Sequence, residues 1–347
     1  MTQPQLKVSP ETLIADIAAV FEQCETVFET ANHTRHYTVA DRTFTAMSDI
    51  APYLNAVDVA VASDEPPTGT GARIFIGVAG QNGCPALHWD APYFEERRIE
   101  ALLKPTRYRM HYFHPLNYWQ IFDRQTSTGL QIMTGPDQHP AWDLGSPLRN
   151  FFQWELASYG GALIHAGTLS VAKKGVLLAG AGGSGKSGTV LSGMLSGLQT
   201  IGDDYVYVMP KSLQAYPLFN TLKQDSAGLK RLGLLGHKAL PTRTNWQNKY
   251  QFYINDLGLT PQPKSISLHA LLLPTIAQSS KTTTVEISAK QAFLALAPSG
   301  VSQIPGDRAQ LYAAAAEVSR NLPCFQLNLG TDPREVSNAI RQFIEEI

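Results

Sequence analysis

The feature that most constrains this chain is a glycine-rich run at residues 180–187, Gly-Ala-Gly-Gly-Ser-Gly-Lys-Ser. It satisfies the pattern G-x-x-x-x-G-K-[ST] at every fixed position. The apolar run at residues 175–179 before it is typical of a buried strand, and apolar side chains recur at helical spacing from Lys186 to about Ser196. A glycine loop between a strand and a helix lets backbone N–H groups and a helix N-terminus surround an anion. The sequence therefore predicts a phosphate-binding loop; a glycine-rich turn without a ligand is the alternative.

Such a loop predicts a nucleotide triphosphate and its metal as ligands. Lys186 would meet the β- and γ-phosphates of ATP, and the Ser187 hydroxyl would reach Mg²⁺. The expected nucleotide-binding residues are Gly180, Gly182, Gly183, Ser184, Gly185, Lys186, Ser187 and Gly188.

Two consecutive carboxylates, Asp203 and Asp204, stand at the entrance to the next apolar run. Adjacent residues of a strand point to opposite sides, so both can reach one site only if the backbone bends, which Gly202 allows. One carboxylate could then bind Mg²⁺ while the other accepts the proton of an attacking hydroxyl. An exposed turn with two solvated aspartates is the alternative.

Histidines offer further candidates. His165 lies in an apolar strand before the loop, where a lone histidine is more often a core residue than a functional one. The pairs His33/His36 and His111/His114 lack the spacing of a helical metal motif and have no cysteine cluster beside them, so we expect structural or surface roles for them.

Composition excludes several classes of protein. The net charge of −1 gives no reason to expect nucleic acid or a membrane as partner. The three cysteines, Cys24, Cys84 and Cys324, are far apart, which suits free thiols in a reducing compartment. No run approaches the ~20 apolar residues of a membrane span, and the first residues lack the apolar core of a signal peptide. We expect a cytoplasmic protein.

The periodicity predicts two domains. Residues 1–145 are expected to form an α+β domain rich in antiparallel sheet, with a helix at residues 10–30 and strands that include residues 57–61, 73–78 and 107–133. This domain shows no catalytic motif and is expected to recognise the substrate. A helix at residues 146–159 begins the second domain, residues 146–347, which is expected to be an α/β catalytic domain.

The run from Leu163 to Gly167, the glycine loop, and Gly202-Asp203-Asp204 resemble the HPr kinase/phosphorylase family in order and spacing. The resemblance implies a fold core shared with phosphoenolpyruvate carboxykinases and an ATP- and Mg²⁺-dependent reaction. It implies that Lys186 and Ser187 bind phosphates and Mg²⁺, that Asp203 is the general base, that Asp204 serves the metal, and that His165 tunes the aspartate pair. The family forms oligomers, which suggests a homo-oligomer.

The chain also departs from that family. The glutamate and the arginine-glycine-leucine run that follow the aspartates in the family are not recognisable, and Asp225 is a candidate replacement metal ligand. A later family arginine has four candidate counterparts here, namely Arg243, Lys223, Lys230 and Arg231. The N-terminal half does not resemble the family.

The resulting expectation is a divergent kinase that transfers the γ-phosphoryl group of ATP to a hydroxyl, in particular a serine or threonine of a protein or biosynthetic peptide. Two alternatives remain open. The acceptor could be a small metabolite, or the chain could be a nucleotide-dependent binding module that phosphorylates nothing.

Overall fold

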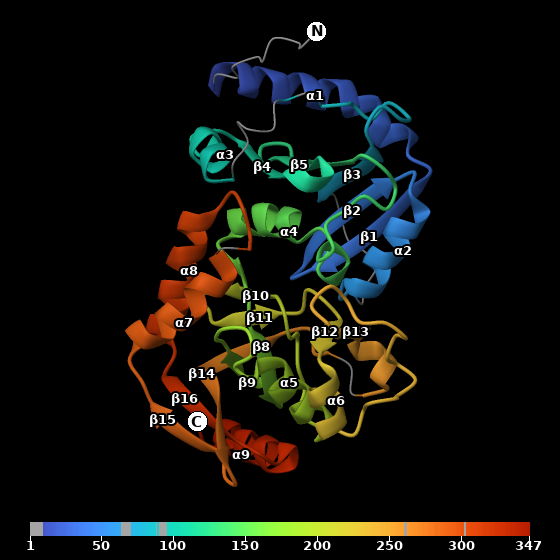
Figure 1. Ribbon diagram of the computed structural model, residues 1–347. Coiled ribbons are helices and arrows are strands. Elements are labelled where there is room, and N and C mark those ends of the chain that lie inside the picture. Colours follow the sequence, from blue (N-terminus) through green and yellow to red (C-terminus); the bar gives the residue numbers. More distant parts are fainter. Residues whose placement is uncertain (1–9, 64–70, 88, 90–95, 260–261, 302) are drawn as a thin grey trace.

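The computed structural model describes residues 10–63, 71–87, 89, 96–259, 262–301 and 303–347. The chain is a mixed α/β protein with a sheet in each half. In Figure 1 the first half lies at the top and the second half below it. No helix in these described ranges has the length and hydrophobicity needed to cross a bilayer.

The first sheet has the strand order β1-β2-β3-β6-β5-β4. Its strands are β1 (His33–Val39), β2 (Arg42–Ser48), β3 (Ala72–Val78), β4 (Tyr108–Phe113), β5 (Tyr118–Asp123) and β6 (Thr128–Met133). β3 pairs in parallel with both β2 and β6, while the other pairings are antiparallel. The sheet is therefore mixed, which is a less uniformly antiparallel arrangement than the sequence predicts.

Helices cover both faces of this sheet (Figure 1). α1 (Pro10–Thr30) and α3 (Glu96–Leu103) pack on one face, together with Phe75 of β3 and Ile121 of β5. The residues adjacent to these in the two strands, Ile74 and Phe122, point to the other face. That other face receives α2 (Ala51–Ala60) and α4 (Arg149–Leu156).

One predicted strand is wrong, and one predicted helix begins later than expected. Residues 57–61 were expected to be a strand, but residues 51–60 form α2, because Tyr53, Leu54, Val57 and Ala60 recur at helical rather than alternating spacing and are buried together. The helix expected from residue 146 begins at Arg149, because Leu148 before it adopts a left-handed conformation with φ 59°.

The second sheet contains the strands β7 (Ala162–Ile164), β8 (Gly167–Val171), β9 (Lys174–Leu178), β10 (Val206–Met209), β11 (Gln214–Tyr216), β14 (Ile266–Ser279), β15 (Thr283–Glu286) and β16 (Cys324–Gly330). β14 is its centre, pairing in parallel with β9 and β16 and antiparallel with β11. A small separate ribbon is formed by β12 (Thr221–Gln224) and β13 (Tyr250–Tyr253).

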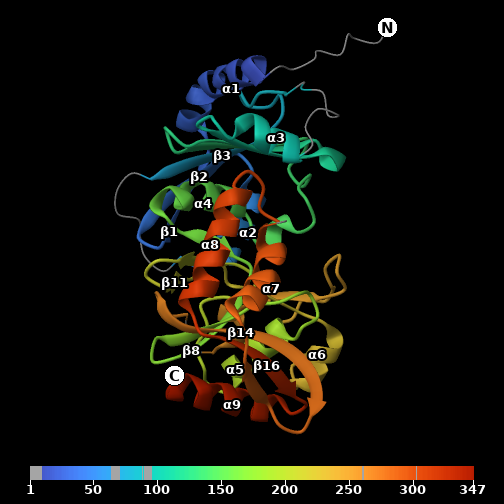
Figure 2. The same cartoon turned by 90° about the vertical axis from the view of Figure 1, so that its left-hand side faces the viewer.

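Helices also cover the two faces of the second sheet. α5 (Lys186–Leu195) and α9 (Pro333–Glu346) pack on one face, and α7 (Ala289–Val301) and α8 (Arg308–Asn321) lie side by side on the other (Figure 2). The remaining helix, α6 (Ser226–Arg231), follows β12.

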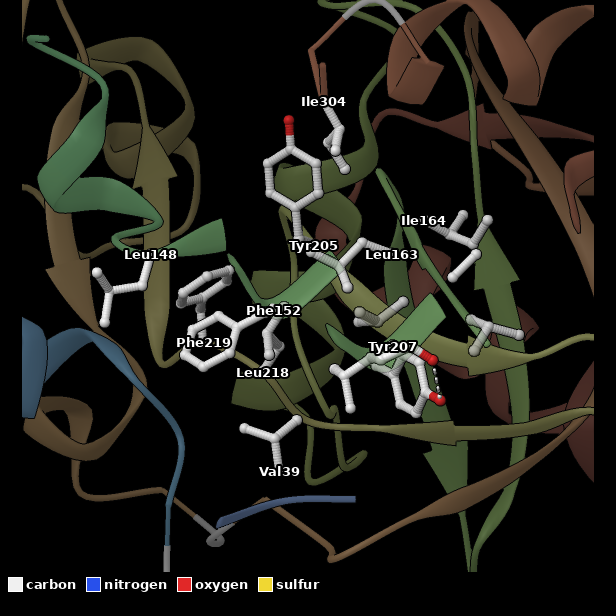
Figure 3. Packing of buried hydrophobic residues seen from close by; sticks show 14 of the residues in the cluster. Val39, Leu148, Phe152, Leu163, Ile164, Tyr205, Tyr207, Leu218, Phe219 and Ile304 are labelled. Carbon is white, nitrogen blue, oxygen red and sulfur yellow. Dashed lines mark hydrogen bonds between the residues drawn. The ribbon is translucent and has the colours of Figure 1, made fainter. Parts of the chain in front are cut away.

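A single buried cluster, here called the junction core, crosses between the two halves. It includes Val39 of β1, Leu148 and Phe152 around α4, and Leu163 of β7 and Phe219 beyond β11 (Figure 3). The rings of Phe152 and Phe219 meet with centroids 6.0 Å apart. Each sheet lies on one side of residue 145, but their cores are continuous here, and the division into two domains stays a prediction.

A buried ion pair also joins the halves. The Arg109 guanidinium of β4 lies 2.8 Å from the carboxylate of Asp307, immediately before α8. Nearby, the indole N–H of Trp154 donates to the carbonyl of Pro305 at 2.8 Å. These contacts hold the segment between α7 and α8 against the first sheet.

Replacing Phe152 with alanine should lower the free energy of unfolding by about 3–5 kcal/mol, because the cavity would open in the middle of the junction core. Val59→Ala, at a side chain 47% exposed, is the control and should change it by less than about 0.5 kcal/mol. Urea unfolding measures both. A loss for Phe152→Ala no larger than the control's would show that the junction core does not stabilise the fold.

Candidate active site

A cavity of about 900 Å³ lies where the phosphate loop faces the first sheet. Both halves line it: His111, Phe113 and Trp142 come from the first, and Arg149, His165, Gly182, Gly183, Gly185, Lys186, Ser187, Gly188, Asp203, Asp204, Lys223, Gln224, Asp225, Ala227, Gly228, Arg231, Trp246, Gln247, Lys249, Ile276, Gln303 and Pro305 from the second. This volume is at the upper end of the range typical of ligand sites. The loop, the aspartate pair and His165, singled out separately in the sequence, meet in this one place.

The loop leaves the end of β9, whose parallel neighbour β14 runs beside it. The carboxyl ends of parallel strands form the edge at which α/β sheets bind ligands. α5 begins at Lys186, so the first amides of a helix face this edge. Gly185 caps the helix with φ 105°, and a Cβ atom there would lie 2.5 Å from Leu329. Glycine is therefore required by both conformation and space.

Lys186 is buried and folds back on the loop. Its ammonium donates to the carbonyls of Gly180 at 2.6 Å and Ala181 at 3.1 Å. Burial lowers the pKa of Lys186, while the charges of Asp203 and Asp204 act in the opposite direction. Its ammonium therefore lies among the loop carbonyls and within electrostatic reach of both aspartates.

The loop contains a buried polar atom without a partner among the described residues, the Ser184 hydroxyl. Leaving a buried hydroxyl unpaired costs about 1–3 kcal/mol, and a phosphate oxygen beside it would remove that cost. Together with the helix amides and the Lys186 ammonium, Ser184 makes the loop able to hold a polyphosphate.

Asp203 is buried, with 4% of its surface exposed. Burial raises its pKa to about 6, despite the opposing effects of a hydrogen bond from Ser187 and the positive charge of Lys186. Its Oδ1 atom has no hydrogen-bond partner in the described part of the chain. Gly167 of β8 makes room for it, because a Cβ atom there would lie 3.3 Å from that oxygen and 2.6 Å from Val190.

Asp204 is held by two side chains. Its Oδ2 accepts from the Lys223 ammonium at 2.8 Å, and its Oδ1 lies 3.0 Å from Nε2 of His165. Burial alone would raise the pKa of Asp204, but Lys223 and the hydrogen bond from His165 hold it well below its usual range. The pKa values of the two adjacent aspartates are thus shifted in opposite directions, a pattern typical of pairs of groups that handle protons.

The expected bend is present around Gly202, because the backbone bends at Ile201, Asp203 and Asp204, and both aspartates precede β10 and line the cavity. His165 stands beside the pair, as expected, and contacts the second aspartate.

The described residues contain no group of three or more His, Cys, Asp or Glu side chains able to hold a metal ion. Mg²⁺ does not need such a group, since it is commonly bound by one or two carboxylates together with substrate phosphates and water. The Ser187 hydroxyl and the carboxylates of Asp203 and Asp204 line the same cavity, and the Oδ1 of Asp203 has no hydrogen-bond partner in the described part of the chain, so these groups fit such an ion. Asp225 lines the cavity, but one of its oxygens caps α6 by accepting from the amide of Gly228 at 2.7 Å.

Of the four basic residues proposed from the sequence, Lys223 and Arg231 line the cavity, whereas Lys230 and Arg243 are not among its lining residues. Sequence reasoning missed His111, Arg149, Trp142, Trp246 and Lys249. No motif marks them, because they come from three separate stretches that only the packing of the two halves brings together. His111 was considered as half of a metal pair, but His114 is exposed at the start of a short 3₁₀ helix, His114–Leu116.

Comparisons with known proteins identify no family for this chain. No family model matches the chain, and no curated protein matches it. Among solved structures, the HPr(Ser) kinase/phosphatase from Coxiella burnetii matches over 53% of this chain and 97% of that one, with 16% identity and a TM-score of 0.27. This is a distant structural relation and carries no argument about chemistry, which must come from the site itself.

Asp203→Asn should change how stability depends on pH. A folded-state pKa of about 6 exceeds the ~3.9 of an unfolded aspartate, so the folded chain keeps a proton that the unfolded chain has lost. This contribution to stability is complete below pH ~4 and disappears as pH rises through ~6. The asparagine variant lacks it, and its stability relative to the wild type should therefore rise by about 2–3 kcal/mol between pH 4 and 7.5.

Urea unfolding at several pH values measures this difference. Asp41→Asn, in the exposed turn between β1 and β2, is a matched control for the change of aspartate to asparagine. A difference between Asp203→Asn and the wild type that stays constant across the pH range would contradict the raised pKa of Asp203.

Proposed function

We propose that this chain is an ATP- and Mg²⁺-dependent kinase that transfers the γ-phosphoryl group to a hydroxyl acceptor. The observation that carries the proposal is the position of Asp203 beside the loop residues Ser187 and Lys186, which both act to lower its pKa, together with its buried Oδ1, which has no hydrogen-bond partner among the described residues. It brings the predicted phosphate site and a candidate proton acceptor into contact, which simple nucleotide binding would not need.

In the proposed reaction, the acceptor oxygen attacks the γ-phosphorus, the bond to the ADP oxygen breaks, and the hydroxyl proton passes to Asp203. A base works best when its pKa is near the working pH, and the raised pKa of Asp203 meets that condition better than the lowered pKa of Asp204. Lys186 and the amides at the start of α5 would stabilise the charge on the transferred group. Bound Mg²⁺ would neutralise phosphate charge and orient the phosphates.

Ser187 and Asp204 are the proposed protein groups for the metal, directly or through water. Asp204 is held in place by Lys223 of β12 and by His165, which lies between β7 and β8, so its position is fixed before any ligand arrives. His165 thus acts on the pair by orienting Asp204, while Lys223 also supplies positive charge to the cavity.

The acceptor is proposed to enter from the side lined by His111, Phe113 and Trp142, which belong to the first half of the chain. This agrees with substrate recognition by residues 1–145. A serine or threonine of a protein or biosynthetic peptide remains the proposed acceptor. A small alcohol is the second candidate, because residues of both halves surround the cavity.

Asp203→Asn should lower the rate of phosphoryl transfer by at least about a hundredfold, while the affinity for the nucleotide changes little. Asp204→Asn should instead raise the Mg²⁺ concentration needed for activity. Asp41→Asn is the control for both. Transfer from γ-labelled ATP to components of a cell extract, and calorimetric binding of an ATP analogue, give the two measurements.

Label on a peptide or protein would support the first acceptor, and label in the small-molecule fraction the second. Full turnover by Asp203→Asn would remove the base assignment. If Asp203→Asn lost its dependence on Mg²⁺ and Asp204→Asn lost phosphoryl transfer, the roles of general base and metal ligand would be exchanged between the two aspartates. Nucleotide binding without any labelled acceptor would overturn the kinase and favour a nucleotide-dependent binding module.

A further inference from the structure

Arg149, at the start of α4, lines the cavity without a carboxylate partner in the described part of the chain. Its hydrogen bonds are long and go to neutral groups: 3.3 Å to the Ser146 hydroxyl and 3.5 Å to the Tyr205 hydroxyl. The charge of Arg149 acts to lower the pKa of Asp143, a pKa that burial raises. Asp143 already accepts hydrogen bonds from the hydroxyls of Tyr53 and Tyr118, and it makes no ion pair with Arg149.

A chain of contacts places Arg149 close to the aspartate pair. Its guanidinium carbon lies 5.4 Å from the centre of the Tyr205 ring, and that ring lies 5.3 Å from the ring of His165. His165 in turn contacts Asp204. Arg149 is therefore linked to Asp204 through the rings of Tyr205 and His165.

The other cationic side chains that line the cavity have hydrogen-bond or ion-pair partners, or lie near the loop and its helix. Lys223 is paired with Asp204, and Lys186 is bonded to loop carbonyls. Arg231 lies beside Gly188 of the loop helix, and the charge of Lys249 acts on Lys186. Arg149 is thus separate from the cations that would meet the nucleotide phosphates.

The surroundings of Arg149 would strengthen its attraction for an anion. Burial, helped by the charge of Arg149, lowers the pKa of His111 to about 3, so this histidine is neutral at physiological pH and does not compete as a cation. Its buried Nδ1 has no hydrogen-bond partner in the described part of the chain, which leaves a polar atom available at the cavity. Phe113 and Trp142 form an aromatic wall beside it, their rings 4.8 Å apart. Charge interactions are stronger at a half-buried side chain such as Arg149 than in open water.

We propose that Arg149 binds a carboxylate of the phosphate acceptor, with His111 as a neutral hydrogen-bonding neighbour, so that the acceptor carries a carboxylate close to its reacting hydroxyl. A guanidinium presents paired N–H donors that match the two oxygens of a carboxylate. This proposal rests on the proposed kinase function and deepens it. A free hydroxy acid and a peptide that ends in serine share this chemistry.

The test compares acids with their neutral amides. The probes are N-acetyl-L-serine and N-acetyl-L-serine amide, and a short peptide ending in serine as the free acid or the amide. With γ-labelled ATP, the wild type should prefer the acid by at least tenfold in kcat/KM. The larger preference in one pair identifies whether a free hydroxy acid or a peptide end is the source of the carboxylate.

Arg149→Gln should reduce this preference to near one, and Arg149→Lys should keep part of it because the charge remains. Arg42→Gln is the matched control, since Arg42 is exposed and lies over the Tyr159 ring, outside the cavity, and it should keep the wild-type preference. Equal rates for acid and amide in the wild type, or an unchanged preference in Arg149→Gln, would overturn the proposal while leaving the kinase intact.

A binding measurement separates this subsite from the kinase itself. N-acetyl-L-alanine has the carboxylate but no hydroxyl, and its binding by calorimetry in the presence of a non-hydrolysable ATP analogue requires no transfer. Binding to the wild type with at least tenfold weaker binding to Arg149→Gln would support the subsite even if no acceptor is phosphorylated. Equal binding to both proteins would overturn it.

Discussion

The backbone ladder of β14 is the constraint on which the rest of the second half depends. This long strand fixes β9 on one side and β16 on the other, both in parallel, and β11 beside its first residues. The ends of β9 and β16 therefore reach the same edge, where the phosphate loop and Leu329 pack together. A loop so rich in glycine has little order of its own, and it takes its shape from the strands beneath it.

Around that edge the chain places two neighbouring carboxylates in opposite electrostatic settings. Asp203 is buried with weak compensation, whereas Asp204 is held between a lysine and a histidine. Burying a carboxylate such as Asp203 is unfavourable for folding at neutral pH, so its placement beside the loop suits a chemical role better than a stabilising one. The same backbone bend at Gly202 makes both settings possible.

The sequence predicts the structure well where a local pattern of residues determines it. Helical spacing predicts the helix at residues 10–30, and the patterns around residues 180–187 predict a strand before the glycine-rich loop and a helix after it; these elements are present, and His165 contacts Asp204. The pattern failed at α2, where a short apolar run fits either helix or strand, and at β3, whose parallel pairing depends on distant segments. His111 and Arg149 could not be found, because only tertiary packing brings them to the cavity.

The ion pair between Arg109 and Asp307 has a consequence for the shape of the cavity. Arg109 shares β4 with His111 and Phe113, and Asp307 follows the lining residues Gln303 and Pro305. The lining that comes from β4 and the lining that precedes α8 are therefore joined by this ion pair. A parting of the halves at this point would have to break the ion pair and the hydrogen bond from Trp154 to Pro305. The ion pair thus fixes the spacing between these two parts of the cavity lining.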